Sequence, residues 1–144
     1  MTRALRALVV EDEALLAMEM ERLLEQAGWT VAAVAVETAG ALAAAAGGPD
    51  LAFVDVNLRD GRTGPDIAAA LIERGVPCVF VTADPQLLPA DLAGALGVLR
   101  KPYAPRTLLA VLTFLQTWLE QGAQPGPAPY GLTLGSGAVV RRRQ

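Results

Sequence analysis

The stretch that decides the fold is Leu51-Ala52-Phe53-Val54-Asp55. A nearly continuous apolar run of this kind is typical of a strand that is buried on both faces, as in a parallel sheet with helices on either side. The run ends on a carboxylate, Asp55. The sequence therefore predicts an interior strand of a parallel sheet, with an acidic side chain at its carboxyl end.

Strand-like runs alternate with helical patterns on both sides of this stretch. The predicted strands cover residues 5–10, 30–36, 51–55, 76–82 and 97–100, and the predicted helices cover residues 14–27, 38–46, 65–75, 87–95 and 105–119. Alternation of this kind predicts an α/β fold in which helices cover both faces of a parallel sheet through right-handed crossovers. The expected architecture is a doubly wound, five-stranded parallel sheet.

Length and composition favour one domain followed by a tail. The chain has 144 residues, of which 53% are hydrophobic and 19% are charged, which is too apolar for a disordered protein. Residues 1–120 are predicted to form the domain. Residues 121–144 are rich in Gly and Pro and are expected to form a hairpin around Gly135-Ser136-Gly137 or to be disordered.

Several functions are disfavoured by composition. The net charge of −3 argues against a general nucleic-acid binder. The apolar stretches are interrupted before the roughly 18 to 20 residues that a membrane span needs, so we expect a cytoplasmic protein. The single cysteine, Cys78, lies in an apolar run and is expected to be a buried small side chain. The chain has no histidine, so it cannot carry a phosphohistidine itself.

The side chains suited to chemistry stand at the ends of predicted strands. Glu11 and Asp12 follow the first strand, Asp55 ends the third, Thr82 ends the fourth, and Lys101 follows the fifth. Ligands of open α/β sheets bind at the carboxyl ends of the strands. We therefore expect these five side chains to converge on one rim of the sheet.

Three carboxylates on one rim predict a metal ion, because like charges resist ionisation together unless a cation lies between them. Oxygen ligands without His or Cys suit Mg²⁺. A carboxylate such as Asp55 can also accept a phosphoryl group, whose charged oxygens the ammonium of Lys101 and the hydroxyl of Thr82 can contact. Each residue alone is more often a turn, a cap or a surface charge, but their joint placement favours a phosphoryl-transfer site.

At these positions the sequence resembles the receiver domains of two-component response regulators, over about residues 5–120. The resemblance rests on Leu-Val-Val-Glu11-Asp12-Glu, Leu-Ala-Phe-Val-Asp55-Val-Asn57-Leu, Val-Phe-Val-Thr82-Ala83-Asp and Leu-Arg-Lys101-Pro102-Tyr. It implies a flavodoxin-like sheet with the strand order 2-1-3-4-5. The output would be protein binding, since no further domain is visible in the sequence, which resembles a stand-alone receiver.

The resemblance also implies a role for each residue of the rim. Asp55 would be the phosphoacceptor, and Mg²⁺ would be held by Glu11, Asp12, Asp55 and the backbone carbonyl of Asn57. Thr82 and Lys101 would contact the phosphoryl group. The phosphate would come from a histidine kinase or a histidine phosphotransfer protein. Such a protein is a signalling protein rather than an enzyme, although it slowly dephosphorylates itself.

The sequence departs from the family at position 98. Many receivers carry Tyr or Phe three residues before the lysine, where this chain has Val98. The signal would then pass through Tyr103 or through a different rearrangement.

The last helix has a second apolar stripe, made of Val111, Phe114 and Trp118. A helix that packs on the core with one face needs only one such stripe. We expect the second stripe to be a partner surface, for example in a homodimer.

Two other functions are compatible with these residues. One is a receiver-like binding module that phosphorylation no longer switches, which Val98 favours and the intact acids disfavour. The other is a phosphohydrolase with an aspartyl-phosphate intermediate. Enzymes of that kind need a second acid two residues after the nucleophile, and here that position is Asn57.

Overall fold

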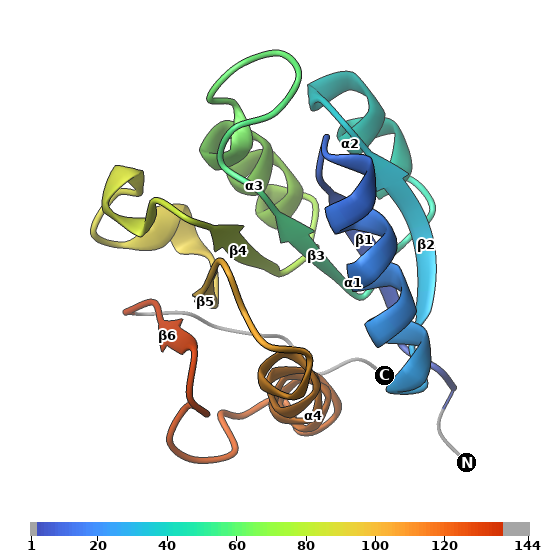
Figure 1. The fold of residues 1–144 in the computed structure, drawn as a ribbon, viewed down its shortest axis with the longest axis vertical. Coiled ribbons are helices and arrows are strands. Elements are labelled where there is room, and N and C mark those ends of the chain that lie inside the picture. The colour runs from blue at the N-terminus through green and yellow to red at the C-terminus, as the bar shows by residue number, and fades with distance from the viewer. Residues whose placement is uncertain (1–2, 137–144) are drawn as a thin grey trace.

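The computed structural model describes residues 3–136. Along the chain the elements are β1 Arg6–Val10, α1 Ala14–Gln26, β2 Thr30–Ala35, α2 Thr38–Ala45, β3 Leu51–Val54, α3 Gly64–Glu73, β4 Cys78–Thr82, the 3₁₀ turns η1 Pro85–Leu87 and η2 Leu92–Gly94, β5 Gly97–Arg100, α4 Pro105–Gln121 and β6 Leu132–Leu134. The predicted α/β class is confirmed (Figure 1).

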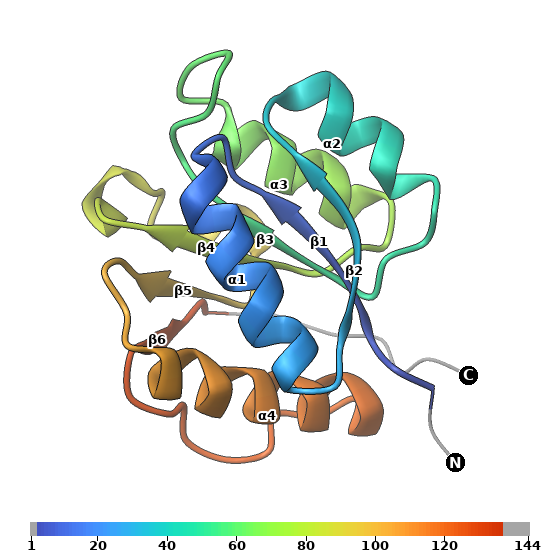
Figure 2. The ribbon, with the colours of Figure 1, turned by 45° about the vertical axis from the view of Figure 1, so that its right-hand side comes forward.

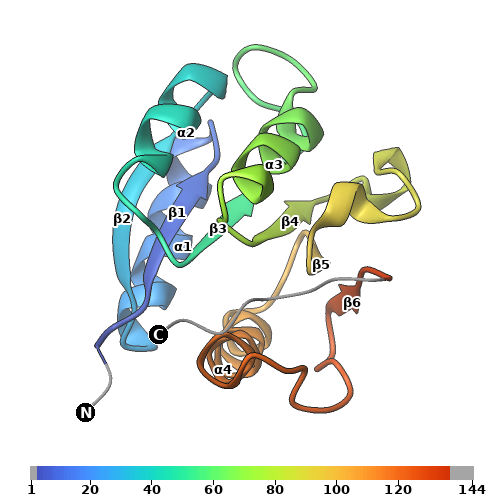
Figure 3. The same cartoon turned by 180° about the vertical axis from the view of Figure 1, so that it is seen from behind.

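The sheet has the strand order β2-β1-β3-β4-β5-β6. The first five strands are parallel to one another and have the predicted order. The sixth, β6, pairs with β5 in the antiparallel direction. Helices α1 and α4 cover one face of the sheet, and α2 and α3 cover the other (Figures 2 and 3).

Strand β3 shows why the sheet is covered on both faces. Each of its four side chains is at most 1% exposed. Leu51 and Phe53 belong to the core beneath α1 and α4, whereas Ala52 and Val54 belong to the core beneath α2 and α3. Alternate residues of a strand point to opposite faces, so the apolar run contributes to both cores.

The predicted helix over residues 87–95 is wrong. The structure has two short 3₁₀ turns there, η1 and η2. Leu92 and Ala93 both have φ 53°, in the left-handed region that residues with a side chain rarely occupy. Two consecutive left-handed residues interrupt any α-helix, so the helical propensity of the surrounding leucines and alanines is overridden.

The second apolar stripe of α4 is not the free surface that the sequence predicts. Val111 is 0% exposed and Trp118 is 4% exposed, while Phe114 is half-buried and lies edge-on to Trp118, with ring centroids 5.9 Å apart. Val111 and Trp118 belong to the core beneath α1 and α4, and Phe114, Ala128 and Leu134 pack against that core. The prediction that Val111 and Trp118 lie on an exposed partner surface is therefore wrong, whereas the homodimer itself stays a prediction.

One arm of the expected hairpin is a strand of the main sheet. Residues 132–134 pair with β5 in the antiparallel direction. The second arm of the expected hairpin lies outside the described residues. Because β6 covers the free edge of β5, the sheet gains a sixth strand that the local pattern did not indicate.

Cys78 lies at the start of β4 and has no exposed surface. Burial raises the pKa of its thiol far above the usual range. The expected role of a small core side chain is consistent with this environment. Over residues 3–136, no helix is both long enough and apolar enough to span a membrane.

Candidate functional site

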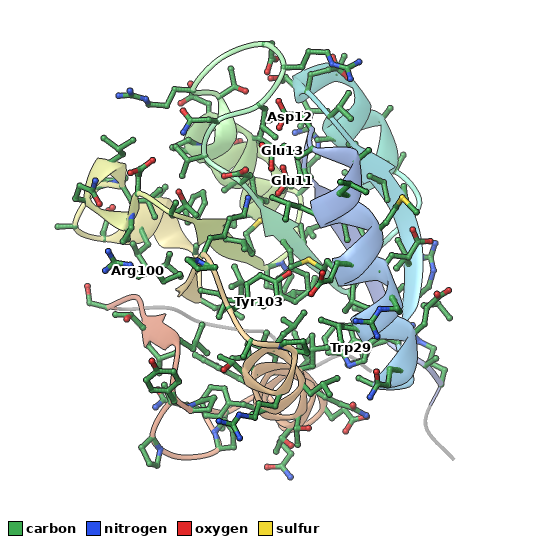
Figure 4. The ribbon with its side chains drawn as sticks, viewed as in Figure 1. Glu11, Asp12, Glu13, Trp29, Arg100 and Tyr103 are labelled. Carbon is green, nitrogen blue, oxygen red and sulfur yellow. The ribbon has the colours of Figure 1, made fainter. Side chains whose placement is uncertain are left out.

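The predicted site residues meet at the carboxyl ends of the parallel strands. Glu11 follows β1, and its N–H donates to the carbonyl of Ala35 in β2 at 2.9 Å. Asp55 follows β3, and its N–H donates to the carbonyl of Val10 at 3.0 Å. Backbone hydrogen bonds to neighbouring strands thus fix where each side chain leaves the sheet. Figure 4 shows Glu11 and Asp12 at this rim, at the beginning of α1.

Lys101 joins two of the acids. Its Nζ donates to Glu11 Oε1 at 2.7 Å and to Asp55 Oδ2 at 2.9 Å. The three side chains are only 16%, 8% and 13% exposed, respectively. The backbone N–H of Lys101 donates to the carbonyl of Thr82 at 2.9 Å, which anchors the lysine beside the end of β4.

The pKa values of Glu11 and Lys101 are both raised, for different physical reasons. Burial raises the pKa of Glu11, and the hydrogen bond from Lys101 offsets only part of this effect. Burial alone would lower the pKa of Lys101, but its hydrogen bonds to Glu11 and Asp55 outweigh burial and raise it. The lysine is therefore firmly protonated and acts as the counter-ion of the site.

Three carboxylates form a cluster with metal-ligand spacing. Glu11, Asp12 and Asp55 each offer an oxygen, and these oxygens lie within 4.8 Å of one another. A donor set made only of oxygens fits Mg²⁺. One ammonium faces three carboxylates here, so a divalent cation would complete the charge balance. The residues present fit the ion that the sequence predicts.

Asp55, Lys101, Asn57 and Thr82 line the same open pocket, of about 370 Å³, together with Asp12. Thr82 is 1% exposed, and its Oγ1 accepts a hydrogen bond of 3.0 Å from the N–H of Asp84. Its hydroxyl proton is left to donate. The structure thus brings together every residue that the sequence singled out for phosphoryl transfer, while the role of each stays a prediction.

Gly64 is a site residue that sequence reasoning missed. It begins α3, and a Cβ there would overlap the carbonyl oxygen of Asp55 and lie 2.6 Å from Val56 Cα. Its N–H donates to the Val56 carbonyl at 3.0 Å. The loop after Asp55 closes directly behind the carboxylate because position 64 has no side chain. A glycine just before the helix proline, Pro65, is the signal that the sequence offered.

A second cavity, of about 410 Å³ and mostly apolar, adjoins the acids. It lies between α1 and the loop after β5, and its lining includes Leu16, Met20, Phe53 and Tyr103. Burial raises the pKa of Tyr103 to about 12, and the charge of Glu19 adds to the effect. Tyr103 therefore stays protonated beside the site, where Figure 4 places it.

Val98, the position where many receivers have an aromatic residue, is 7% exposed in β5. It pairs with Phe80 of β4 on one side and with Thr133 of β6 on the other. Its side chain packs in the core beneath α2 and α3. The residue is enclosed on both edges by neighbouring strands.

The fold and the pocket define a class of protein: a flavodoxin-like α/β domain with an acid cluster and a paired lysine at the carboxyl ends of its strands. A family model described as the response regulator receiver domain matches residues 7–113. The chain belongs to the response regulator receiver domain family.

Relatives of known name agree with this family. The phyllosphere-induced regulator PhyR of Methylorubrum extorquens is 33% identical over 114 residues, which cover 76% of this chain and 43% of PhyR. The chain thus spans less than half the length of this curated relative. The solution structure of the PhyR receiver domain of Erythrobacter litoralis is similar with a TM-score of 0.72 and 26% identity, covering 88% of this chain and 96% of that one.

A further similar structure is that of SdrG from Sphingomonas melonis. Its TM-score is 0.65 at 34% identity, and the match covers 78% of this chain and 97% of that one. The similarity to SdrG therefore extends over nearly the whole of that protein.

Proposed function

We propose that this chain is the phosphoacceptor of a two-component phosphorelay, that Asp55 receives the phosphoryl group in the presence of Mg²⁺, and that the signal is passed on by protein binding. The observation that carries the proposal is the contact of Lys101 Nζ with Asp55 Oδ2 at 2.9 Å inside the cluster of three acids. A protonated lysine beside the acceptor carboxylate is already in position to stabilise the negative charge of a phosphoryl group.

In the proposed reaction a carboxylate oxygen of Asp55 attacks the phosphorus of a phosphohistidine on a partner. An O–P bond forms, the P–N bond breaks, and the imidazole leaves with the bonding electron pair and takes up a proton. The transferred group carries its charge on three oxygens, which positioned cations and donors must meet. Since the chain has no histidine, the donor is a histidine kinase or a histidine phosphotransfer protein.

The chain's own residues divide this work. Glu11, Asp12, Asp55 and the backbone carbonyl of Asn57 would hold Mg²⁺, which neutralises the carboxylates and the phosphoryl oxygens when it is bound. Lys101 would stay on Glu11 and contact one phosphoryl oxygen, and Thr82 would donate its hydroxyl to another. Slow hydrolysis of the aspartyl phosphate would bring the protein back to its unphosphorylated state.

The donor protein needs a surface beside Asp55, and α1 offers one. Leu15 and Met18 are 81% and 63% exposed, and Leu16 lines the apolar cavity that also reaches Asp55. Exposed apolar side chains next to a reactive pocket suit a protein partner. A phosphohistidine donor and its receiver meet in the cytoplasm, which we propose as the compartment.

The test is phosphorylation of the whole chain by acetyl phosphate with Mg²⁺, followed by intact-mass measurement. We expect the mass gain of one phosphoryl group, lost in Asp55→Asn and retained in the matched control Asp66→Asn, which changes an exposed acid of α3. No adduct with acetyl phosphate or a phosphorylated kinase would favour the inert binding module. Steady release of phosphate from small phosphoesters would favour a phosphohydrolase.

A further inference from the structure

Strand β6 occupies an edge of the sheet that would otherwise be open. Leu132, Thr133 and Leu134 face Leu99, Val98 and Gly97 of β5, respectively. The N–H of Gly135 donates to the carbonyl of Leu96 at 2.8 Å and extends the pairing by one residue. Figure 3 shows β6 as the last strand beyond β5.

The edge of β5 is shaped for a strand that approaches closely. A Cβ at Gly97 would lie 2.6 Å from the carbonyl oxygen of Thr133, and a Cβ at Gly135 would lie 2.7 Å from the carbonyl oxygen of Ala95. Side chains at these two positions would push the strands apart. Gly97 belongs to β5 and not to β6. The space that it leaves at the edge of β5 is therefore open to extended chains other than β6 as well.

The side chains of β6 hold it weakly. Leu132 is 6% exposed, whereas Leu134 is half-buried and Thr133 points to solvent. The free energy gained by burying one leucine is of the same order as the entropy lost when a few residues are fixed. Edge segments with few buried contacts open without unfolding of the whole domain.

The start of β6 also leaves two positive charges without a counter-ion. Arg100 and Arg106 line a pocket of about 620 Å³ beside Tyr130 and Gly131. Within residues 3–136 neither arginine forms an ion pair. The chain's own strand has no acid at this end, since Pro129, Tyr130 and Gly131 precede Leu132.

We propose that β6 is an exchangeable cover of the β5 edge, and that an extended segment of a partner protein displaces it. The segment would carry the pattern apolar-polar-apolar, as in Leu132-Thr133-Leu134, preceded within two residues by Asp or Glu. Addition of a strand to an exposed sheet edge is a common mode of peptide recognition, in which main-chain hydrogen bonds give affinity and side-chain pockets give specificity. The carboxylate of this acid would be the counter-ion for Arg100 and Arg106.

Two labelled peptides test the proposal on the full-length chain. One has the sequence of residues 129–136, and the other is identical except that Asp replaces Tyr at the position of Tyr130. By fluorescence anisotropy we expect the acidic peptide to bind about threefold more tightly, and we expect this preference to vanish in Arg100→Gln with Arg106→Gln. In Leu132→Asp, which loosens the cover, both peptides should bind about tenfold more tightly.

The controls distinguish binding at the β5 edge from non-specific binding of the peptides. Gly97→Val places a side chain against the incoming carbonyl and should abolish binding, whereas Thr133→Val changes an exposed residue and should leave binding unchanged. A scrambled peptide should not bind. Equal binding by Gly97→Val or by the scrambled peptide would overturn the proposal. So would a dimer of Leu132→Asp in light scattering, because the edge would then accept a second copy.

Hydrogen exchange of the unmodified chain gives an independent reading should Leu132→Asp fail to fold. The amide of Gly135, which bonds across the edge to Leu96, should exchange about a hundredfold faster than the amides of the interior strands. Equal protection of Gly135 and the interior amides would mean that the cover opens only with global unfolding, and the proposal would be wrong. Neither reading depends on phosphorylation of Asp55.

Discussion

Replacing Lys101 by Met tests the charge balance of the site most directly. Methionine keeps much of the length and volume of the lysine stem but removes the ammonium that contacts Glu11 at 2.7 Å and Asp55 at 2.9 Å. Without it, the clustered carboxylates of Glu11, Asp12 and Asp55 repel one another. We expect a clear loss of stability in metal-free buffer.

The magnitude follows from the geometry. At an effective dielectric constant of about 20, two unit charges about 4 Å apart attract by about 4 kcal/mol, and desolvation of the lysine cancels a large share of that. Fully exposed ion pairs contribute about 0 to 1 kcal/mol, and loss of one partner of a buried pair costs about 3 to 5 kcal/mol. Lys101 is 16% exposed, so we expect a loss of about 2 kcal/mol.

The assay is urea unfolding followed by tryptophan fluorescence, since Trp29 and Trp118 are 3% and 4% exposed. With a urea dependence of about 2 kcal/mol/M, the midpoint of Lys101→Met should fall by about 1 M. Mg²⁺ at about ten times its dissociation constant should restore about 1.4 kcal/mol. At one common Mg²⁺ concentration the ion should stabilise the variant more than the unchanged chain, because the variant has more uncompensated negative charge and should bind Mg²⁺ more tightly.

Arg100→Met is the matched control, because Arg100 is the preceding residue and is exposed. It should shift the midpoint little, with or without Mg²⁺. An unchanged midpoint for Lys101→Met in metal-free buffer would refute the idea that the lysine neutralises the acids. A loss of stability that Mg²⁺ does not reduce would refute the idea that the same acids bind the ion.

Three more predictions concern other parts of the chain. Gly64→Ala should destabilise the fold by about 2 kcal/mol in urea unfolding and slow phosphorylation of the chain, because a Cβ there meets the backbone behind the acceptor; normal stability would contradict this. Ala93→Gly should be neutral or stabilising by up to about 1 kcal/mol in thermal unfolding, since its φ is 53°, whereas the control Ala110→Gly within α4 should cost about 1 kcal/mol. Asp60 accepts hydrogen bonds from Thr38 and Thr63, and these lower the pKa of its carboxyl to about 2. Because this lies below the unfolded value of about 3.9, its stabilising effect should be full above about pH 4 and disappear as the pH falls towards 2. Carbon-detected NMR titration should show the low value, and Thr38→Val should raise it; an ordinary value in the unchanged chain would be evidence against these contacts.

The sequence predicted the parts of the structure that depend on local pattern. Strand β3 is apolar throughout because both of its faces are buried, and that property is visible in four residues of sequence. The positions of Glu11, Asp55 and Lys101 at the ends of parallel strands then follow from topology, because such ends share one rim. The pairing of Lys101 with both acids, at 2.7 and 2.9 Å, needed the tertiary structure.

Non-local contacts explain what the sequence did not predict. A short run such as Leu132–Leu134 between glycines predicts a strand, but the local pattern does not indicate that this strand pairs with β5. Val111 and Trp118 are apolar because they belong to the buried core beneath α1 and α4, onto which Ala128 and Leu134 of the tail also pack. A helical pattern shows that a face is buried, but it cannot show whether the cover comes from a partner or from the same chain.

The environment of Cys78 has a practical consequence for work on this protein. Its thiol is fully buried and its pKa is raised by burial, so it should not react with maleimides or other alkylating reagents while the chain is folded. A cysteine introduced at an exposed position such as Thr133 would then be the single reactive handle. Dyes or spin labels attached there would report on one chosen place in an otherwise unaltered sequence.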